Sequence, residues 1–117
     1  MDIPLPILKA DIWVHAHIRL CNSRNIPAFV VHRGDGSSGI VLIKLNMFAK
    51  GCYVLSPMTG MDGNRIWFPA TGSQPVDEAT ADEYITRQRS MDRDCWVIEL
   101  ESPDGQHLLD EPVELST

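Results

Sequence analysis

The sequence predicts an α+β fold with two main helices and a largely antiparallel sheet of four to six strands. Apolar residues recur with helical spacing in two segments, and short stretches rich in β-branched and aromatic residues follow each of them. Clusters of Gly, Pro, Asn and Asp separate these stretches, which gives the order helix–strand–strand–strand–strand–helix–strand. Because 117 residues suit one ordinary domain and no linker interrupts them, we expect a single domain over 1–117. Its end, 110–117, is expected to be a short strand or a loose tail.

The first segment, WVHAHIRLC at 13–21, fits two periodicities. As a strand, it places His15 and His17 on one face, where both imidazoles could reach one metal ion. As a helix, it points them about 200° apart and brings His17 next to Cys21, one turn away. About twenty residues around this segment contain no turn signal, and such a length favours the helix. We therefore expect a helix, histidines with a structural role, and no bound metal.

The later elements are predicted from their composition and their flanking residues. The stretch 39–46 is apolar almost throughout, so we expect it at the centre of the sheet with both faces covered. The second helix is expected to begin after Asp77, a suitable N-cap, because acidic residues crowd its first turns and Arg87 and Arg89 lie in its last. Five stretches have the composition of strands: 26–33, 39–46, 51–56, 65–69 and 95–101.

The sequence GDGSSG matches the glycine pattern G-x-G-x-x-G of dinucleotide-binding loops and protein kinases. The dinucleotide version needs a following helix whose N-terminal N–H groups receive the pyrophosphate, whereas here a strand is predicted to follow. The kinase version needs catalytic motifs that this chain lacks. We therefore predict a hairpin loop of about five or six residues that joins the strands at 26–33 and 39–46, and no cofactor.

Charge is distributed unevenly along the chain. Residues 1–53 have a net charge of +3 and residues 54–117 a net charge of −9, which together give −6. The acidic total argues against nucleic-acid binding, but the basic first half and an arginine cluster keep a nucleic-acid-binding domain as an alternative. The charged residues that we take as a candidate binding surface are Arg33, Asp35, Lys44, Arg87, Arg89 and Arg93.

Several features indicate a cytoplasmic protein without a membrane segment. The longest apolar run, 39–43, is much shorter than the roughly 20 residues of a membrane span. The N-terminal stretch MDIPLPILKAD does not have the pattern of a secretory signal. Cys21, Cys52 and Cys95 are odd in number and scattered, which suits reduced thiols better than a disulfide framework.

The order helix–strand–strand–strand–helix–strand resembles the core of restriction-endonuclease-like nucleases, whose metal site combines an Asp with an acid-x-Lys triplet on the next strand. Here Asp35 and Lys44 match the outer positions, but Leu42 stands where the acid is required. Without that carboxylate, Mg²⁺ loses a ligand and the hydrolytic water loses its activation. The resemblance implies at most a catalytically inactive relative, and no other arrangement of residues leads us to assign a catalytic residue.

Five blocks run along nearly the whole chain: LKADIWVHAHIRLC, IPAFVVHRGD, GIVLIKLN, DEYITRQRSMDRDCWVIELE and HLLDEPV. In this order they resemble an uncharacterised bacterial group, the domain-of-unknown-function family 1491. The resemblance implies a leading helix followed by a sheet, and it implies no activity, cofactor or partner.

The sequence therefore favours a small non-enzymatic domain that binds a protein partner or itself. On a helix, the apolar arc of the first segment spans about 200°, about twice the stripe of a helix that packs on a sheet, so part of it is free for another chain. The strands at 51–56 and 65–69 are short, and one of them is expected at an edge of the sheet, where it can pair with another chain. Both features favour a homodimer.

Overall fold

The computed structural model describes residues 9–37 and 39–114. Three of the expectations above fall partly outside these ranges. They concern the N-terminal stretch without a secretory signal, most of which lies in 1–8, the GDGSSG loop, which includes Ser38, and the predicted tail, of which 115–117 are not described.

The segment 13–21 is helical, as predicted, and belongs to α1, Ala10–Ser23. The H-x-H arrangement of a strand therefore does not form. The buried residues of α1 are spaced three or four apart and face the sheet: Ala10, Val14, His17 and Cys21.

The second helix, α2, spans Glu78–Met91 and begins where the sequence predicts. The side chain of Asp77 caps it by accepting a hydrogen bond from the backbone N–H of Thr80 at 2.8 Å. Ala81 and Ile85 are its buried residues. Within the described part of the chain, neither helix is long and apolar enough to cross a membrane.

Five strands form one sheet in the order β1-β5-β2-β3-β4. β2 and β5 are parallel and the other neighbours are antiparallel, which confirms the α+β fold with a largely antiparallel sheet. β2 lies at the centre of the order and is buried along its length, as predicted. A short 3-10 helix, Phe48–Lys50, follows it. The strands are β1 Ala28–His32, β2 Val41–Asn46, β3 Cys52–Thr59, β4 Arg65–Pro69 and β5 Trp96–Glu101.

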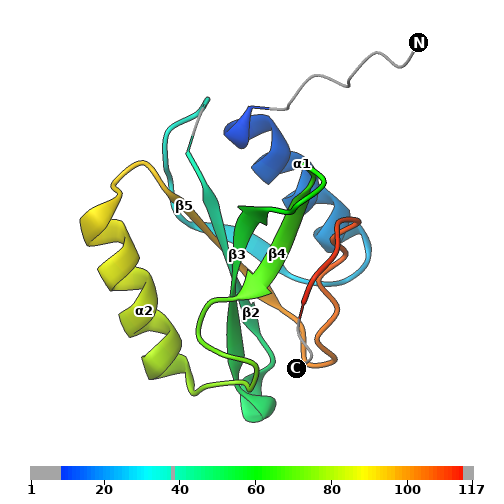
Figure 1. The fold of residues 1–117 in the computed structure, drawn as a ribbon. Coiled ribbons are helices and arrows are strands. Elements are labelled where there is room, and N and C mark those ends of the chain that lie inside the picture. Colours follow the sequence, from blue (N-terminus) through cyan, green and yellow to red (C-terminus); the bar gives the residue numbers. More distant parts are fainter. Residues whose placement is uncertain (1–8, 38, 115–117) are drawn as a thin grey trace.

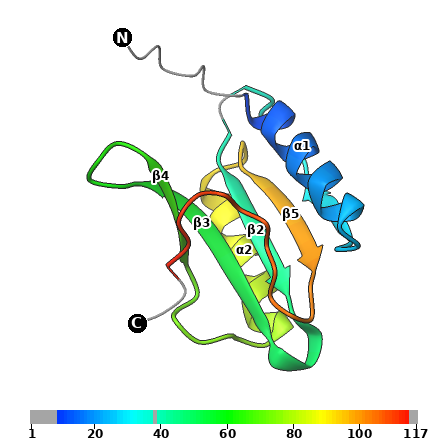
Figure 2. The same ribbon diagram turned by 90° about the vertical axis from the view of Figure 1, so that its right-hand side faces the viewer.

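The sheet lies between the two helices (Figure 1). Side chains alternate along β2, so that Ile43 and Leu45 join the core beneath α1, whereas Leu42 joins the core beneath α2. Residues 105–114, which we call the C-terminal strap, cross the same face as α1 while α2 lies behind the sheet (Figure 2).

The strap pairs with the outer side of β4. The backbone N–H of Trp67 donates to the Pro112 carbonyl, and the N–H of Glu114 donates to the Trp67 carbonyl, each at 2.9 Å. Val113 forms a parallel bridge with Trp67. Residues 112–114 of the predicted tail thus continue the sheet as a short strand-like contact, and 115–117 lie outside the described residues.

The GDGSSG loop does not join a hairpin, so that prediction was wrong. β5 lies between β1 and β2, and the loop therefore crosses the start of β5. The N–H of Asp35 donates to the Asp94 carbonyl at 2.9 Å, and the indole N–H of Trp96 donates to the Asp35 carbonyl at 2.7 Å. A Cβ atom at Gly34 or Gly39 would overlap the Asp94 carbonyl, so these glycines allow the loop to approach β5 closely.

Candidate functional site

Lys44 is a buried residue at the centre of a cluster of charges between β2 and α2, in which the two carboxylates on α2 are exposed. Its Nζ atom lies 2.7 Å from the carboxylates of Glu78 and Asp82 on α2 and 3.4 Å from that of Glu99 on β5. The side chain of Asn46 donates to Glu99 at 3.2 Å. Because the Lys44 side chain is only 5% exposed, these bonds fasten the first half of α2 to the centre of the sheet.

The cluster keeps Lys44 protonated. Burial alone lowers the pKa of Lys44, but the hydrogen bonds to Asp82 and Glu78 and the charge of Glu99 outweigh burial and raise this pKa above its ordinary value. A lysine that stays charged cannot act as a base or a nucleophile near neutral pH. The cluster therefore serves as an anchor for α2. Among residues 9–37 and 39–114, no group of three or more His, Cys, Asp or Glu side chains is arranged to hold a metal ion.

The six residues taken as a binding surface do not lie together in the structure. Asp35 lies beside Trp96 on the α1 side of the sheet, whereas Lys44 points to α2, so the two outer positions of the nuclease-like motif are apart. The guanidinium of Arg33 lies 5.2 Å from the centre of the Trp96 ring. The remaining three lie on α2 or just after it: Arg87, Arg89 and Arg93.

The three cysteines are free and buried. Burial raises the pKa of Cys21 to about 11, and it also raises the pKa values of Cys52 and Cys95 above their ordinary value. Such thiols are protonated at neutral pH, and a protonated thiol is a poor nucleophile and a poor metal ligand. The cysteines therefore contribute to packing.

A stack of rings lies between α1 and β4. The imidazole of His17 stacks on Trp13 with ring centres 4.9 Å apart, and Trp13 stacks on Trp67 at 5.6 Å. The guanidinium of Arg65 lies 5.8 Å from the ring centres of both tryptophans. The indole N–H of Trp67 donates to the Glu111 carboxylate in the strap at 3.0 Å. His17 is buried and hydrogen-bonded to the strap, whereas His15 is exposed.

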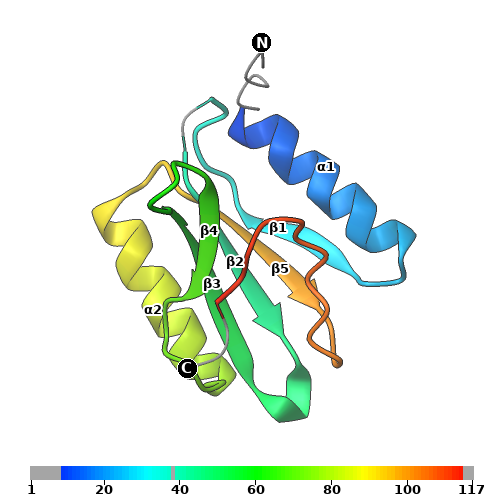
Figure 3. The same ribbon diagram turned by 45° about the vertical axis from the view of Figure 1, so that its right-hand side comes forward.

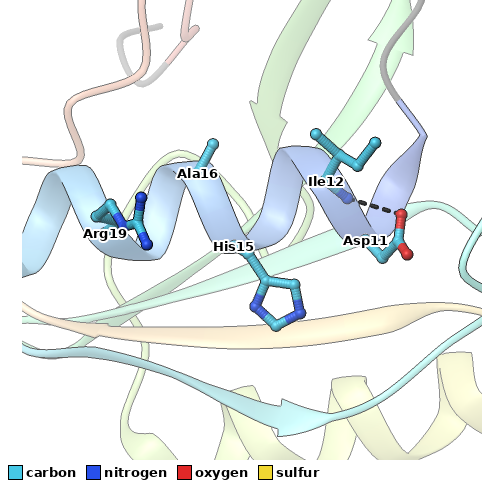
Figure 4. Close-up of a pocket in the computed structure, with 5 residues that line it drawn as sticks. All are labelled: Asp11, Ile12, His15, Ala16 and Arg19. Atoms are coloured by element: carbon cyan, nitrogen blue, oxygen red, sulfur yellow. Dashed lines mark hydrogen bonds between the residues drawn. The ribbon is translucent and has the colours of Figure 1, made fainter.

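The outer face of α1 carries a shallow hollow of about 380 Å³. Ile12 and Ala16 project from one side of the helix and His15 from the other (Figure 4). Leu20, which belongs to the wide apolar arc, is 39% exposed, and Ile12, next to the arc, is 51% exposed. The hollow lacks the convergent polar groups of a small-molecule site. All the residues that line it come from α1: Asp11, Ile12, His15, Ala16 and Arg19.

β1 is an edge strand whose outer side is partly open. The Pro27 carbonyl accepts a hydrogen bond from the N–H of Glu101, so it faces β5. Ala28 faces away from β5: its N–H donates to the Asn22 side chain at 3.2 Å, and its carbonyl accepts from that side chain at 3.1 Å. Because outward-facing residues alternate in an antiparallel strand, the N–H and C=O of Val30 also point away from β5. Within the described ranges, no strand pairs with these two groups.

Two apolar side chains are exposed beside this open edge. Phe29 is 42% exposed and Val31 is 39% exposed. Phe29 is paired with Glu99, which points to Lys44, so Phe29 lies on the α2 face of the sheet. α2 packs mainly on β2 and β3 and leaves this corner of the sheet uncovered. The β1 edge thus combines exposed apolar surface with backbone groups that pair with no strand in the part of the chain that the structure describes.

Exposed basic side chains lie on α1 and, in the chain, before and after β1. α1 and β1 lie together on one side of the molecule (Figure 3). Of the acids on this side, Asp11 and Asp35 are half-buried and accept hydrogen bonds from nearby backbone N–H groups, whereas Asp94, whose carbonyl accepts from the Asp35 N–H, is exposed. Positive charge is also exposed on this side, and it suits a partner that carries acidic residues. Four exposed residues carry it: Lys9, Arg19, Arg24 and Arg33.

The sequence interpretation identified neither the β1 edge nor the Lys44 cluster. Of the two strands expected to supply an edge, β4 does lie at one, but the strap bonds to the outer groups of Trp67 at its middle. β1 was missed because the edge was expected from the two short stretches at 51–56 and 65–69. A signal was present, since Phe29 and Val31 alternate with Ala28 and Val30, which gives the strand two apolar faces although it is not central.

Comparisons with known proteins place the chain beside relatives without a described activity. The family model described as "Protein of unknown function (DUF1491)" matches residues 8–110. A crystal structure, at 1.87 Å resolution, of a DUF1491 family protein from Caulobacter crescentus CB15 is 38% identical, with a TM-score of 0.81 over 92% of this chain and 100% of that chain. An NMR structure of a DUF1491 family protein from the same organism is 38% identical, with a TM-score of 0.78 over 94% and 99%.

A more distant neighbour shares the fold alone. The solution structure of protein Atu0922 from A. tumefaciens has a TM-score of 0.76 at 20% identity, over 94% of this chain and 98% of that chain. No curated protein matches the chain.

Proposed function

The chain belongs to the DUF1491 family of proteins of unknown function, and from its surface we propose that it is a small protein-binding domain. The observation that carries the proposal is the β1 edge, where no strand among the described residues pairs with the outward N–H and C=O of Val30, and where Phe29 and Val31 are exposed. An extended segment of another protein can add to such an edge as a further strand. Main-chain hydrogen bonds then supply affinity, and alternate side chains supply specificity.

The partner that we propose is an extended apolar segment with acidic residues at its ends. Apolar side chains at alternate positions would cover Phe29 and Val31, and acids at the ends would meet Arg24 and Arg33. A second copy of the chain suits the edge less well. Antiparallel pairing of two β1 strands about Val30 directs Arg33 of one copy toward the end of the other copy that carries Arg24, and like charges repel.

Two features limit the length of strand that can be added. Asn22 occupies the outer groups of Ala28, and the strand has a bulge between Val30 and His32. Such features protect edge strands from uncontrolled pairing. Because few main-chain groups are left, we expect binding to be weak and reversible.

Peptides of about ten residues test the proposal when they alternate Val or Phe with Thr and end in pairs of Glu. At about 1 mM they should slow solvent exchange of the Val30 amide, and matched peptides that end in Lys should act at least about tenfold more weakly. The double variant Phe29→Lys, Val31→Lys should lose the effect. Met61→Lys, in the fully exposed turn between β3 and β4, should keep it.

Light scattering at low and high salt, run on the same samples, shows whether a second copy of the chain occupies the β1 edge. Protection of Val30 that rises with protein concentration without peptide, together with a dimer, would assign the edge to a second copy and contradict the proposed partner. If neither peptide affects Val30 and the protein is monomeric, strand addition at β1 is wrong.

A further inference from the structure

The strap contains a turn that a histidine side chain holds in place. The Nδ1 atom of His107 accepts a hydrogen bond from the backbone N–H of Leu109 at 3.0 Å. Leu108, between them, has a φ of 57°, in the left-handed region that a leucine seldom adopts. Since Nδ1 accepts this bond, it carries a lone pair and no proton. The turn therefore exists in this form only while His107 is neutral.

A second histidine connects the same turn to α1. The Nε2 atom of His17 lies 2.9 Å from the carbonyl oxygen of His107. A carbonyl only accepts hydrogen bonds, so Nε2 carries the hydrogen and donates. The ring of His17 is stacked almost parallel on Trp13, at an interplanar angle of 7°. The two histidines thus link α1, the strap and the ring stack on β4.

The surroundings of both rings favour their neutral forms. Burial lowers the pKa of His17, and the bond to His107 and the charges of Asp110 and Glu111 in the strap oppose this only in part. Burial and the neighbouring His17 lower the pKa of His107. From β4, Arg65 places a further positive charge beside Trp13, on which His17 stacks.

The direction of the pH dependence follows from these shifts. Both histidines bind protons more weakly in the strapped state than in a released strap, where their pKa returns to about 6.5. Above that value both states are neutral and the strapped state keeps its full stability. As the pH falls below it, the released state takes up protons first and becomes favoured.

We propose that His107 and His17 form a pH-operated latch, which holds the strap on β4 near neutral pH and releases it when His107 is protonated. The added proton occupies the lone pair of Nδ1, so the N–H of Leu109 loses its acceptor and meets a donor instead. Release of the strap exposes the outer N–H and C=O of Trp67, and β4 becomes a second open edge. The latch lies at the opposite edge from the proposed binding strand and does not depend on it.

Amide exchange by NMR, corrected for the intrinsic effect of pH, tests the latch in the full chain. The amides of Trp67 and Glu114 report the strap, because each donates across the strap–β4 contact. The amide of Ile98 in β5 reports the centre of the sheet. Between about pH 7.5 and about pH 5, we expect the protection of Trp67 and Glu114 to fall at least about tenfold while that of Ile98 is maintained.

Two variants separate the latch from a general effect of acid. In His107→Asn, the side-chain oxygen can accept the Leu109 N–H in the manner of an Asx turn and does not titrate, so the strap should stay protected at about pH 5. His15→Gln removes an exposed histidine from α1 and should respond as the wild type does.

Three results would overturn the latch. One is unchanged protection of Trp67 and Glu114 in the acidic wild type, and another is a parallel loss at Ile98, which indicates unfolding of the whole domain. The third is a His107→Asn variant whose strap loosens in acid as much as that of the wild type.

Discussion

The two edges of the sheet are completed by different parts of the chain. At β4, the backbone of the strap bonds to both outer groups of Trp67. At β1, the side chain of Asn22 bonds to the outer groups of Ala28, and those of Val30 have no strand beside them among the described residues. Each edge thus has the outer groups of one residue satisfied, but the strap also forms a bridge between Val113 and Trp67 and accepts a hydrogen bond from the Trp67 indole, whereas Asn22 adds no further contact with β1. The comparison therefore assigns stability to the β4 edge and leaves β1 available to a partner.

The edges also differ in the surface behind them. β4 is backed by the stack of Trp13 and Trp67, and Arg65 lies 3.7 Å from the Glu111 carboxylate of the strap. β1 is covered by α1 on one face, but its Phe29 and Val31 are exposed. Apolar surface next to open backbone groups is typical of a strand that another chain completes.

The largest effect is expected from Trp67→Ala, which removes the residue on which the β4 edge depends. Trp67 is fully buried, and its side chain contacts both α1 and the strap. We expect the free energy of unfolding to fall by about 3–5 kcal/mol in urea denaturation. Met61→Ala in the neighbouring exposed turn is the control and should change it by less than about 0.5 kcal/mol. If Trp67→Ala lowers the free energy of unfolding by less than about 1 kcal/mol, the β4 edge contributes no more to stability than the β1 edge does.

A smaller effect is expected from Asn22→Ala, which opens the β1 edge further and leaves the β4 edge as it is. The variant loses both side-chain bonds to Ala28 and should destabilise the fold by about 1 kcal/mol. It also frees the outer groups of Ala28, so the peptides that end in Glu should bind more tightly than to the wild type. Ser23→Ala is a matched control, because the Ser23 hydroxyl bonds only within α1. Unchanged or weaker peptide binding by Asn22→Ala would place the open edge elsewhere.

The smallest effect is expected from Glu111→Gln, which removes a charge from the strapped edge and keeps an oxygen acceptor for the Trp67 indole. The ion pair with Arg65 is partly exposed, so stability at neutral pH should fall by less than about 0.5 kcal/mol. Because the Glu111 charge raises the pKa of His17, its removal should lower that pKa further. NMR titration of the His17 ring measures this shift. A shift to higher pH would contradict the electrostatics described for the latch.

The sequence predicted those parts of the molecule whose causes lie close together in the chain. The periodicity of residues 13–21 distinguished the buried His17 from the exposed His15, because on a helix they face different directions. Asp77 was identified as a cap from its residue type and from the acidic residues that follow it, and the N–H that it accepts, that of Thr80, is only three residues away. The strand at 65–69 was predicted within its observed bounds from its aromatic residues and the turn before it.

The candidate site was predicted only in its components. Phe29 and Val31 were assigned to a strand, but their exposure was not predicted, because the sequence offered β2 as the pairing partner of β1. Lys44 was singled out for a motif with Asp35, whereas its actual partners are more than thirty residues away along the chain. Neither the link between His17 and His107 nor the cover over β4 has a signal in the local pattern.

The sequence by itself determined the helices, the strands and the order in which they occur, because hydrophobic period, caps and turn residues act over a few positions. Only the tertiary structure decided which strand lies beside which. The insertion of β5 between β1 and β2 converted an expected hairpin loop into a crossing over Trp96 and made β1 an edge. Pairing between distant strands depends on how whole faces pack against α1 and α2, and no short stretch of sequence contains that information.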